Sequence, residues 1–68
     1  MLEYGYRGEV VKYVYGHGKL WTAQGHLESE PSVTVKTWPF PTKREADEEF
    51  REKARKIIDD KLGPPLVA

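Results

Sequence analysis

The chain has 68 residues, of which 38% are hydrophobic and 32% charged, and its 11 basic and 11 acidic side chains give a formal net charge of zero. This length allows one domain with a single small core, and the composition is typical of a folded protein rather than a disordered one. The absence of cysteine excludes disulfides, and no apolar run approaches the roughly 20 residues that span a membrane.

The first residues give no targeting signal. Met1-Leu2-Glu3-Tyr4 lacks the basic start and the apolar stretch of a signal peptide. Together with the missing cysteines, this predicts an intact cytoplasmic protein that does not enter a membrane.

The first part of the chain is expected to form three β-strands, at Tyr6–Tyr15, Leu20–Leu27 and Val33–Trp38, because these runs are rich in β-branched and aromatic side chains. Gly16-His17-Gly18 is predicted to connect the first two strands as a tight hairpin. The polar, proline-broken segment Glu28–Ser32 is predicted to connect the second strand to the third. Two short antiparallel connections predict a three-stranded meander.

The pairing of the first two strands has two alternatives. A two-residue turn at His17-Gly18 places Val14 opposite Trp21, whereas a three-residue loop at Gly16-His17-Gly18 places Tyr13 opposite Trp21. A slip of one residue moves every side chain of a strand to the other face of the sheet, so the sequence does not decide which residues face the core. In the third strand the alternation is clear. Val33 and Val35 are predicted to face the helix, and Thr34 and Lys36 to face away from it.

One amphipathic helix is predicted at residues 43–62. Thr42 is a good N-cap, and Glu45 three residues later completes a capping box. Gly63 can take the left-handed conformation that ends a helix, and Pro64-Pro65 forbids continuation. The charged residues are interpreted as a solvated surface, and the apolar stripe toward the sheet consists of Ala46, Phe50, Ala54, Ile57, Ile58 and Leu62.

These elements predict an α+β fold of β-β-β-α order, with the helix packed on one face of the sheet. We assign residues 1–62 to this single domain and residues 63–68 to a short C-terminal tail. A single helix covers one face of the sheet, and the chain has eight aromatic residues. We therefore expect tyrosines on the uncovered face, where an aromatic surface is typical of a binding site. The residues of this candidate binding face are Tyr6, Tyr13, Tyr15, Lys36 and Trp38.

Few residues suit catalysis. The chain has no cysteine nucleophile, and Ser29 and Ser32 lie in a polar turn. His17, His26 and Glu28 lack the short spacing that is typical of a metal site. We therefore predict no catalytic, cofactor-binding or metal-binding residues, and a protein that is not an enzyme.

Two short motifs resemble known families. Tyr6-Arg7-Gly8 and Phe40–Ala46 resemble the starts of the first strand and of the helix in the plant ethylene-response-factor type of DNA-binding domain, and the phage integrase N-terminal arm domains share this order of elements. The resemblance implies that the sheet reads DNA, and the residues onto which that role carries over are Arg7, Lys12, Lys36 and Trp38. Against this role, the strands carry few basic residues, and Glu9 and Glu28 would repel phosphate. The chain is also similar to small bacterial three-strand-plus-helix domains that begin Tyr-Arg-Gly, which implies a fold and no known activity.

We therefore expect a small non-enzymatic interaction module that needs no cofactor. It would use the open sheet face to bind a protein partner or a second copy of itself. Nucleic-acid binding through the same sheet is the alternative, which the zero net charge disfavours.

Overall fold

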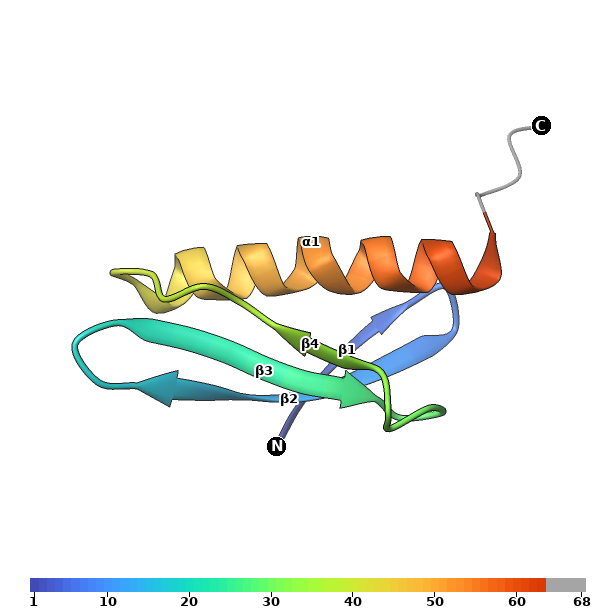
Figure 1. Ribbon diagram of the computed structural model, residues 1–68, viewed down its shortest axis with the longest axis horizontal. Helices are drawn as coiled ribbons and strands as arrows, with labels where there is room; N and C mark the ends of the chain where they lie inside the picture. Colours follow the sequence, from blue (N-terminus) through green and yellow to red (C-terminus); the bar gives the residue numbers. More distant parts are fainter. Residues whose placement is uncertain (64–68) are drawn as a thin grey trace.

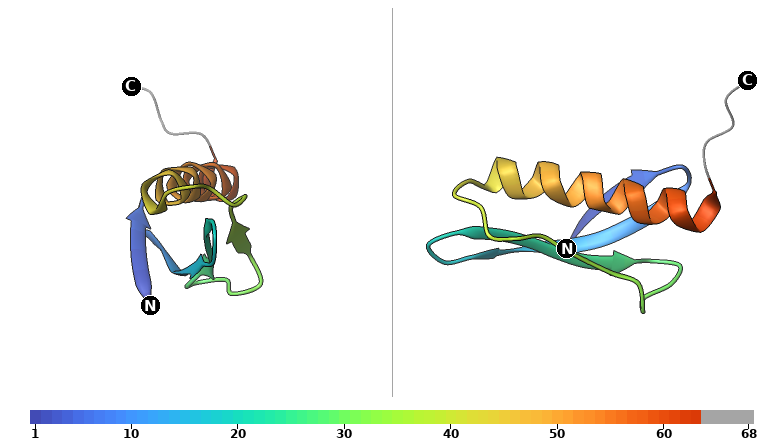
Figure 2. Two further views of the ribbon diagram at one scale, coloured as in Figure 1. Left: turned by 90° about the vertical axis from the view of Figure 1, so that its left-hand side faces the viewer. Right: turned by 45° about the horizontal axis from the view of Figure 1, so that its top comes forward.

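The computed structural model describes residues 1–63, so residues 64–68 of the predicted tail lie outside the described residues. The fold is α+β as predicted, with an antiparallel sheet packed beneath one C-terminal helix (Figure 1). The sheet has four strands rather than three, in the order β1-β2-β3-β4. Seen end-on, it curls below the helix with β1 and β4 at its two flanks (Figure 2, left). The elements are β1 (Leu2–Tyr6), β2 (Glu9–His17), β3 (Trp21–Leu27), β4 (Thr34–Lys36) and α1 (Lys43–Leu62).

The additional strand is β1, which pairs with β2 through a two-residue turn at Arg7 and Gly8. Both residues have positive φ, 52° and 82°, as a type I′ hairpin turn requires. Glycine adopts this conformation without steric cost, and it is uncommon for a residue such as arginine. The segment predicted as one strand from Tyr6 to Tyr15 therefore contains a turn near its start.

β2 and β3 pair in a register that neither predicted alternative contains. His17 lies opposite Trp21, and the loop between the strands consists of residues 18–20. Gly16 and His17, which were expected in the turn, belong to β2. A Cβ atom at Gly16 would lie 2.6 Å from the Thr22 hydroxyl oxygen, so a larger residue here would require the Thr22 side chain to move.

A bulge shortens β4 relative to the predicted strand. The Thr37 N–H donates to the Ala23 carbonyl (3.0 Å), and two further hydrogen bonds join Phe40 and Trp21 (2.7 and 2.8 Å). The chain advances three residues from Thr37 to Phe40 while β3 advances two residues between Ala23 and Trp21. One extra residue therefore lies at Trp38-Pro39, which is a bulge. Proline has no N–H to donate to the ladder, so a bulge at this point is the expected accommodation.

α1 spans the residues predicted for it. Thr42 has an extended backbone, and its hydroxyl accepts a hydrogen bond from the Glu45 N–H at 3.2 Å. Gly63 follows with a φ of 84°. Leu62, predicted in the apolar stripe, is 44% exposed, whereas the rest of the stripe faces the sheet. The buried core between the two layers consists of Val11, Tyr13, Ala23, Leu27, Val35, Phe50, Ala54 and Ile58.

Within residues 1–63, no helix combines the length and the apolar composition needed to cross a membrane.

Candidate binding surface

The tyrosines lie on the sheet face that α1 covers, so the prediction of Tyr6, Tyr13 and Tyr15 on the open face is wrong. Tyr13 is buried and stacks on Phe50, with ring centroids 4.4 Å apart. Tyr15 packs edge-on against Tyr13 at 5.7 Å, and Tyr6 packs half-buried against the same core. Tyr13 and Tyr15 alternate onto the same side of β2 as the core residue Val11, and the core under the single helix accommodates all three.

Carboxylates on one flank of α1 accept hydrogen bonds from these tyrosine hydroxyls. The Tyr13 and Tyr15 hydroxyls both donate to Asp47 Oδ1, at 3.1 and 2.7 Å. Toward the other end of the helix, the Tyr6 hydroxyl donates to the Asp59 carboxylate at 3.1 Å.

Two arginines, Arg51 and Arg55, lie between Asp47 and Asp59 on this flank of α1 and contact Tyr4. Arg55 donates to the Tyr4 hydroxyl at 3.1 Å. Arg51 pairs with Asp47 at 3.1 Å and lies over the Tyr4 ring. The four helix residues recur at i, i+4 spacing and so share one flank of α1. Arg51 stays exposed, whereas Asp47, Arg55 and Asp59 are half-buried, so this row is only partly the solvated surface expected from the sequence. We call the contact the tyrosine seam, and its residues are Tyr4, Tyr6, Tyr13, Tyr15, Asp47, Arg51, Arg55 and Asp59.

The seam commits its polar atoms to internal partners. Burial raises the pKa of Tyr15, and the hydrogen bond to Asp47 raises it further, so the hydroxyl keeps the proton that it donates. Asp47 uses one carboxylate oxygen for two hydroxyls and the other for Arg51. These tyrosines therefore hold the helix on the sheet and are not presented to a partner.

Trp38 is the one exposed residue among the phenylalanines, tyrosines and tryptophans of residues 1–63, with 73% of its surface accessible. It lies in the bulge, and bulges commonly redirect a side chain away from the regular alternation of a strand. Lys53 Nζ lies 5.8 Å from the centroid of the indole ring. A hollow of about 460 Å³ adjoins the ring and is lined by Thr22, Lys36, Thr37, Trp38, Pro39 and Lys53.

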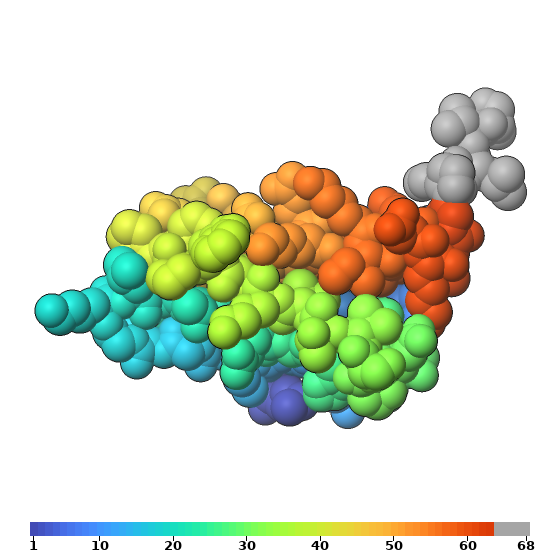
Figure 3. All heavy atoms as spheres, in the orientation of Figure 1, coloured from blue at the N-terminus to red at the C-terminus, as the bar shows by residue number. Residues whose placement is uncertain are grey.

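A second hollow, of about 290 Å³, lies between α1 and β4 (Figure 3). We call it the β4 groove, and its residues are Thr34, Val35, Lys36, Lys53, Lys56 and Ile57. Its apolar residues, Val35 and Ile57, also pack against the core. Lys56 pairs with Glu52 at 3.6 Å, whereas Lys36 and Lys53 form no ion pair within residues 1–63. The groove is therefore apolar in part and positively charged.

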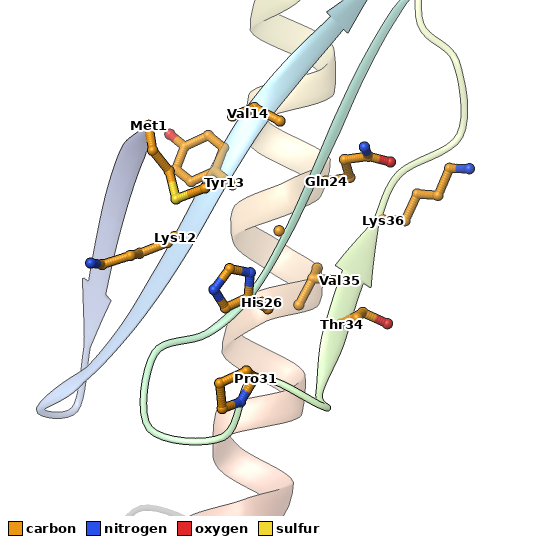
Figure 4. Close-up of a pocket in the computed structure, with 11 residues that line it drawn as sticks. Met1, Lys12, Tyr13, Val14, Gln24, His26, Pro31, Thr34, Val35 and Lys36 are labelled. Atoms are coloured by element: carbon orange, nitrogen blue, oxygen red, sulfur yellow. The ribbon is translucent and has the colours of Figure 1, made fainter.

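The open face of the sheet carries charged, polar and apolar side chains. Lys12, Gln24, His26 and Lys36 lie on three neighbouring strands around a hollow of about 440 Å³ (Figure 4). Lys12 also reaches Glu3 of β1 at 3.9 Å, which offsets part of its charge. The His26 imidazole lies on this face (Figure 4), and the tyrosines predicted for it do not.

The four sequence-predicted nucleic-acid contacts are brought together only in part. Arg7 lies at the end of the molecule near the C-terminus of α1, where it donates to Asp59 at 2.9 Å and to the Gly63 carbonyl at 2.7 Å. Lys12 and Lys36 line the hollow of the open face, and Lys36 and Trp38 line the hollow beside the indole ring. Lys36 is shared by the two hollows, and Arg7 lines neither.

Sequence reasoning missed Lys53 and Lys56 of α1. Their spacing of three residues places them on one helix flank, beside Ile57. Nothing in the local sequence indicates that this flank faces β4, because that depends on how α1 crosses the sheet.

The two histidines lie in different parts of the sheet. The His17 ring stacks on Trp21, with centroids 3.8 Å apart. His26 lies opposite Lys12 in the middle of the sheet. Among residues 1–63, no group of three or more histidine, aspartate or glutamate side chains has the arrangement to hold a metal ion.

No protein-family model, curated protein or solved structure matches this chain. Its function is therefore inferred from its own geometry and chemistry.

Proposed function

We propose that this protein is a non-enzymatic interaction module that binds a protein partner through Trp38 and the β4 groove. The exposure of Trp38 supports the proposal, because the other tyrosine, phenylalanine and tryptophan side chains of residues 1–63 are buried or half-buried. Tryptophan in a partly apolar hollow is typical of the residues that dominate the energy of protein interfaces. Of the predicted binding face, Lys36 and Trp38 remain in the proposed surface.

The charges around Trp38 favour a protein over a nucleic acid. Only Lys36 and Lys53 lack a carboxylate partner within the described part of this surface, since Lys56 pairs with Glu52. A nucleic-acid site gains affinity by neutralising several phosphates. Two lysines without a carboxylate partner, beside an apolar hollow, instead suit a protein that offers an apolar anchor residue and a few carboxylates.

Affinity capture with matched variants tests the proposal. Wild-type protein, Trp38→Ala and Leu2→Ala are immobilised and exposed to nuclease-treated cell extract, and the bound proteins are quantified by mass spectrometry. Leu2 is a suitable control because it is also an exposed apolar residue, and it lies in β1 at the opposite edge of the sheet. We expect proteins that wild type and Leu2→Ala retain and Trp38→Ala loses. Equal capture by all three proteins would contradict the proposal.

Two further measurements identify the other classes of partner. Sedimentation over a range of concentrations detects self-association, and a dimer that Trp38→Ala abolishes would make the partner a second copy of the chain. Titration with single-stranded and duplex oligonucleotides at low salt addresses nucleic acid. Trp38-dependent binding that weakens steeply with salt would replace the proposed protein partner with a nucleic acid.

A further inference from the structure

The outer edge of β4 directs backbone groups that do not bond to β3 toward the β4 groove. Val33 and Thr37 hydrogen-bond to β3, and Val35 lies between them opposite a β3 residue. Backbone N–H and C=O groups alternate in direction along a strand, so those of Thr34 and Lys36 point away from β3. β4 is the last strand of the sheet, and its edge is therefore available to another strand.

Lys53 closes one position of this edge. Its ammonium group donates to the Lys36 carbonyl oxygen at 3.0 Å. Lysines near an edge strand commonly protect it from pairing with other chains. A carboxylate is a stronger acceptor for an ammonium group than a neutral carbonyl, because the hydrogen bond is assisted by charge on both sides. An acidic ligand is therefore suited to draw Lys53 away and expose the carbonyl.

The groove also supplies contacts for the side chains of an added strand. Val35 and Ile57 offer an apolar surface, and Lys36, Lys53 and Lys56 surround it with positive charge. The opposite flank of α1 differs, because its charged row is engaged in the tyrosine seam. The two flanks of the helix thus have different roles, one fixing the fold and one bordering an open edge.

We propose that the β4 groove binds an extended acidic segment of the partner as an added β-strand, with Lys53 acting as a latch. A carboxylate of the segment takes the Lys53 ammonium group, and the released Lys36 carbonyl accepts a backbone N–H from the segment. The apolar residues of the segment pack on Val35 and Ile57. This inference rests on the proposed function, since it specifies the chemistry of the partner and its mode of binding.

The test uses a blocked hexapeptide of alternating glutamate and valine as the probe. Binding is followed through the backbone amide signals of the full-length protein by NMR, together with hydrogen exchange at Thr34 and Lys36. We expect the peptide to shift the signals of β4 and of the α1 flank around Lys53, and to slow exchange at Thr34 and Lys36. A peptide with lysine in place of glutamate, and one with alternate backbone nitrogens methylated, should bind at least about tenfold more weakly, because each loses an interaction with a charged group or a hydrogen-bond donor.

Substitutions of Lys53 test the latch. Lys53→Met should weaken binding of the glutamate peptide by about tenfold or more, whereas Lys53→Arg should retain most of the affinity. Lys19→Met is the control, because Lys19 lies in the loop between β2 and β3 and should leave binding unchanged. Dispersed amide spectra establish that each variant is folded.

The inference would be overturned by equal binding of the glutamate and lysine peptides, by equal binding of the methylated and unmethylated peptides, or by unchanged exchange at Thr34 and Lys36. Lack of any peptide binding would do the same. These outcomes are separable from failure of the proposed function. If Trp38-dependent capture of a protein persists while the peptide does not bind, the interaction module stands and strand addition is rejected.

Discussion

Replacing Asp47 by alanine tests whether the tyrosine seam holds the helix on the sheet. The substitution removes the acceptor of the Tyr13 and Tyr15 hydroxyls and the partner of Arg51. A hydrogen bond to a charged group contributes about 1.5–3 kcal/mol when buried. The Asp47 side chain is 20% exposed, so water replaces part of what is lost, and we expect the variant to lose about 2–3 kcal/mol in total. That is a large share of the stability of so small a domain.

Urea denaturation followed by far-UV circular dichroism measures this loss. Glu48→Ala is the matched control, because Glu48 is the next helix residue and its pair with Arg44, at 3.1 Å, is exposed on both sides. We expect it to cost less than about 0.5 kcal/mol. In a double-mutant cycle, Tyr15→Phe should cost less in the Asp47→Ala background than in wild type. Equal free energies of unfolding for Asp47→Ala and Glu48→Ala would refute a stabilising role of the seam.

Three further variants test separate features of the fold. Thr42→Ala removes the N-cap hydroxyl of α1 and should cost about 1 kcal/mol in thermal unfolding. Gly25→Ala should cost about 3 kcal/mol or prevent folding, since its Cβ atom would lie 2.6 Å from the Cβ atom of Tyr13. The hydrogen bond from Lys61 holds the pKa of Glu9 below its usual value of 4.5. The resulting stability is present above pH 4.5 and is lost as the pH falls through the lower folded-state pKa, so wild type should lose more stability on acidification than Glu9→Gln does.

Each of these predictions has an outcome that contradicts it. An unchanged melting temperature for Thr42→Ala would place the start of the helix elsewhere. Gly18→Ala is the control for Gly25→Ala, because nothing lies within 4 Å of a Cβ atom at Gly18, and equal effects of the two would exclude close packing at Gly25. Parallel pH profiles of wild type and Glu9→Gln, measured from urea midpoints, would show that the contact with Lys61 is not maintained in solution.

The helix could be predicted residue by residue because its signals are local. The Thr42 cap, the apolar stripe and Gly63 each act within one or two turns of the chain, and the structure confirms the bounds of α1. The sheet depends on pairings between distant residues. Gly16 and Gly18 are typical turn residues, yet the hairpin turn with positive φ angles is formed by Arg7 and Gly8, between β1 and β2. The misplaced turns displaced the register of β2 and β3. The tyrosines were misassigned for another reason, because carboxylates of α1 accept their hydroxyl hydrogen bonds and one helix covers more rings than expected.

The binding surface could be predicted only in part, for a related reason. Trp38 and Lys36 were recognised as candidates from the strand pattern, and Pro39 is the one local signal of the bulge, since proline disrupts regular pairing. Lys53 is indistinguishable from the other helix charges in the sequence. Its importance arises from the crossing of α1 over β4, which brings its ammonium group to the Lys36 carbonyl. Such a contact between elements has no signature in the residues that precede or follow it.

Hydroxyl-radical footprinting, read residue by residue by mass spectrometry, measures the accessibility of every aromatic ring in solution. Relative to the unfolded chain, we predict that Trp38 is modified at nearly its full rate and that Tyr13 and Tyr15 are strongly protected. Rapid modification of Tyr13 and Tyr15 together with protection of Trp38 would contradict both the covered tyrosines and the exposed tryptophan from which the proposed function is inferred.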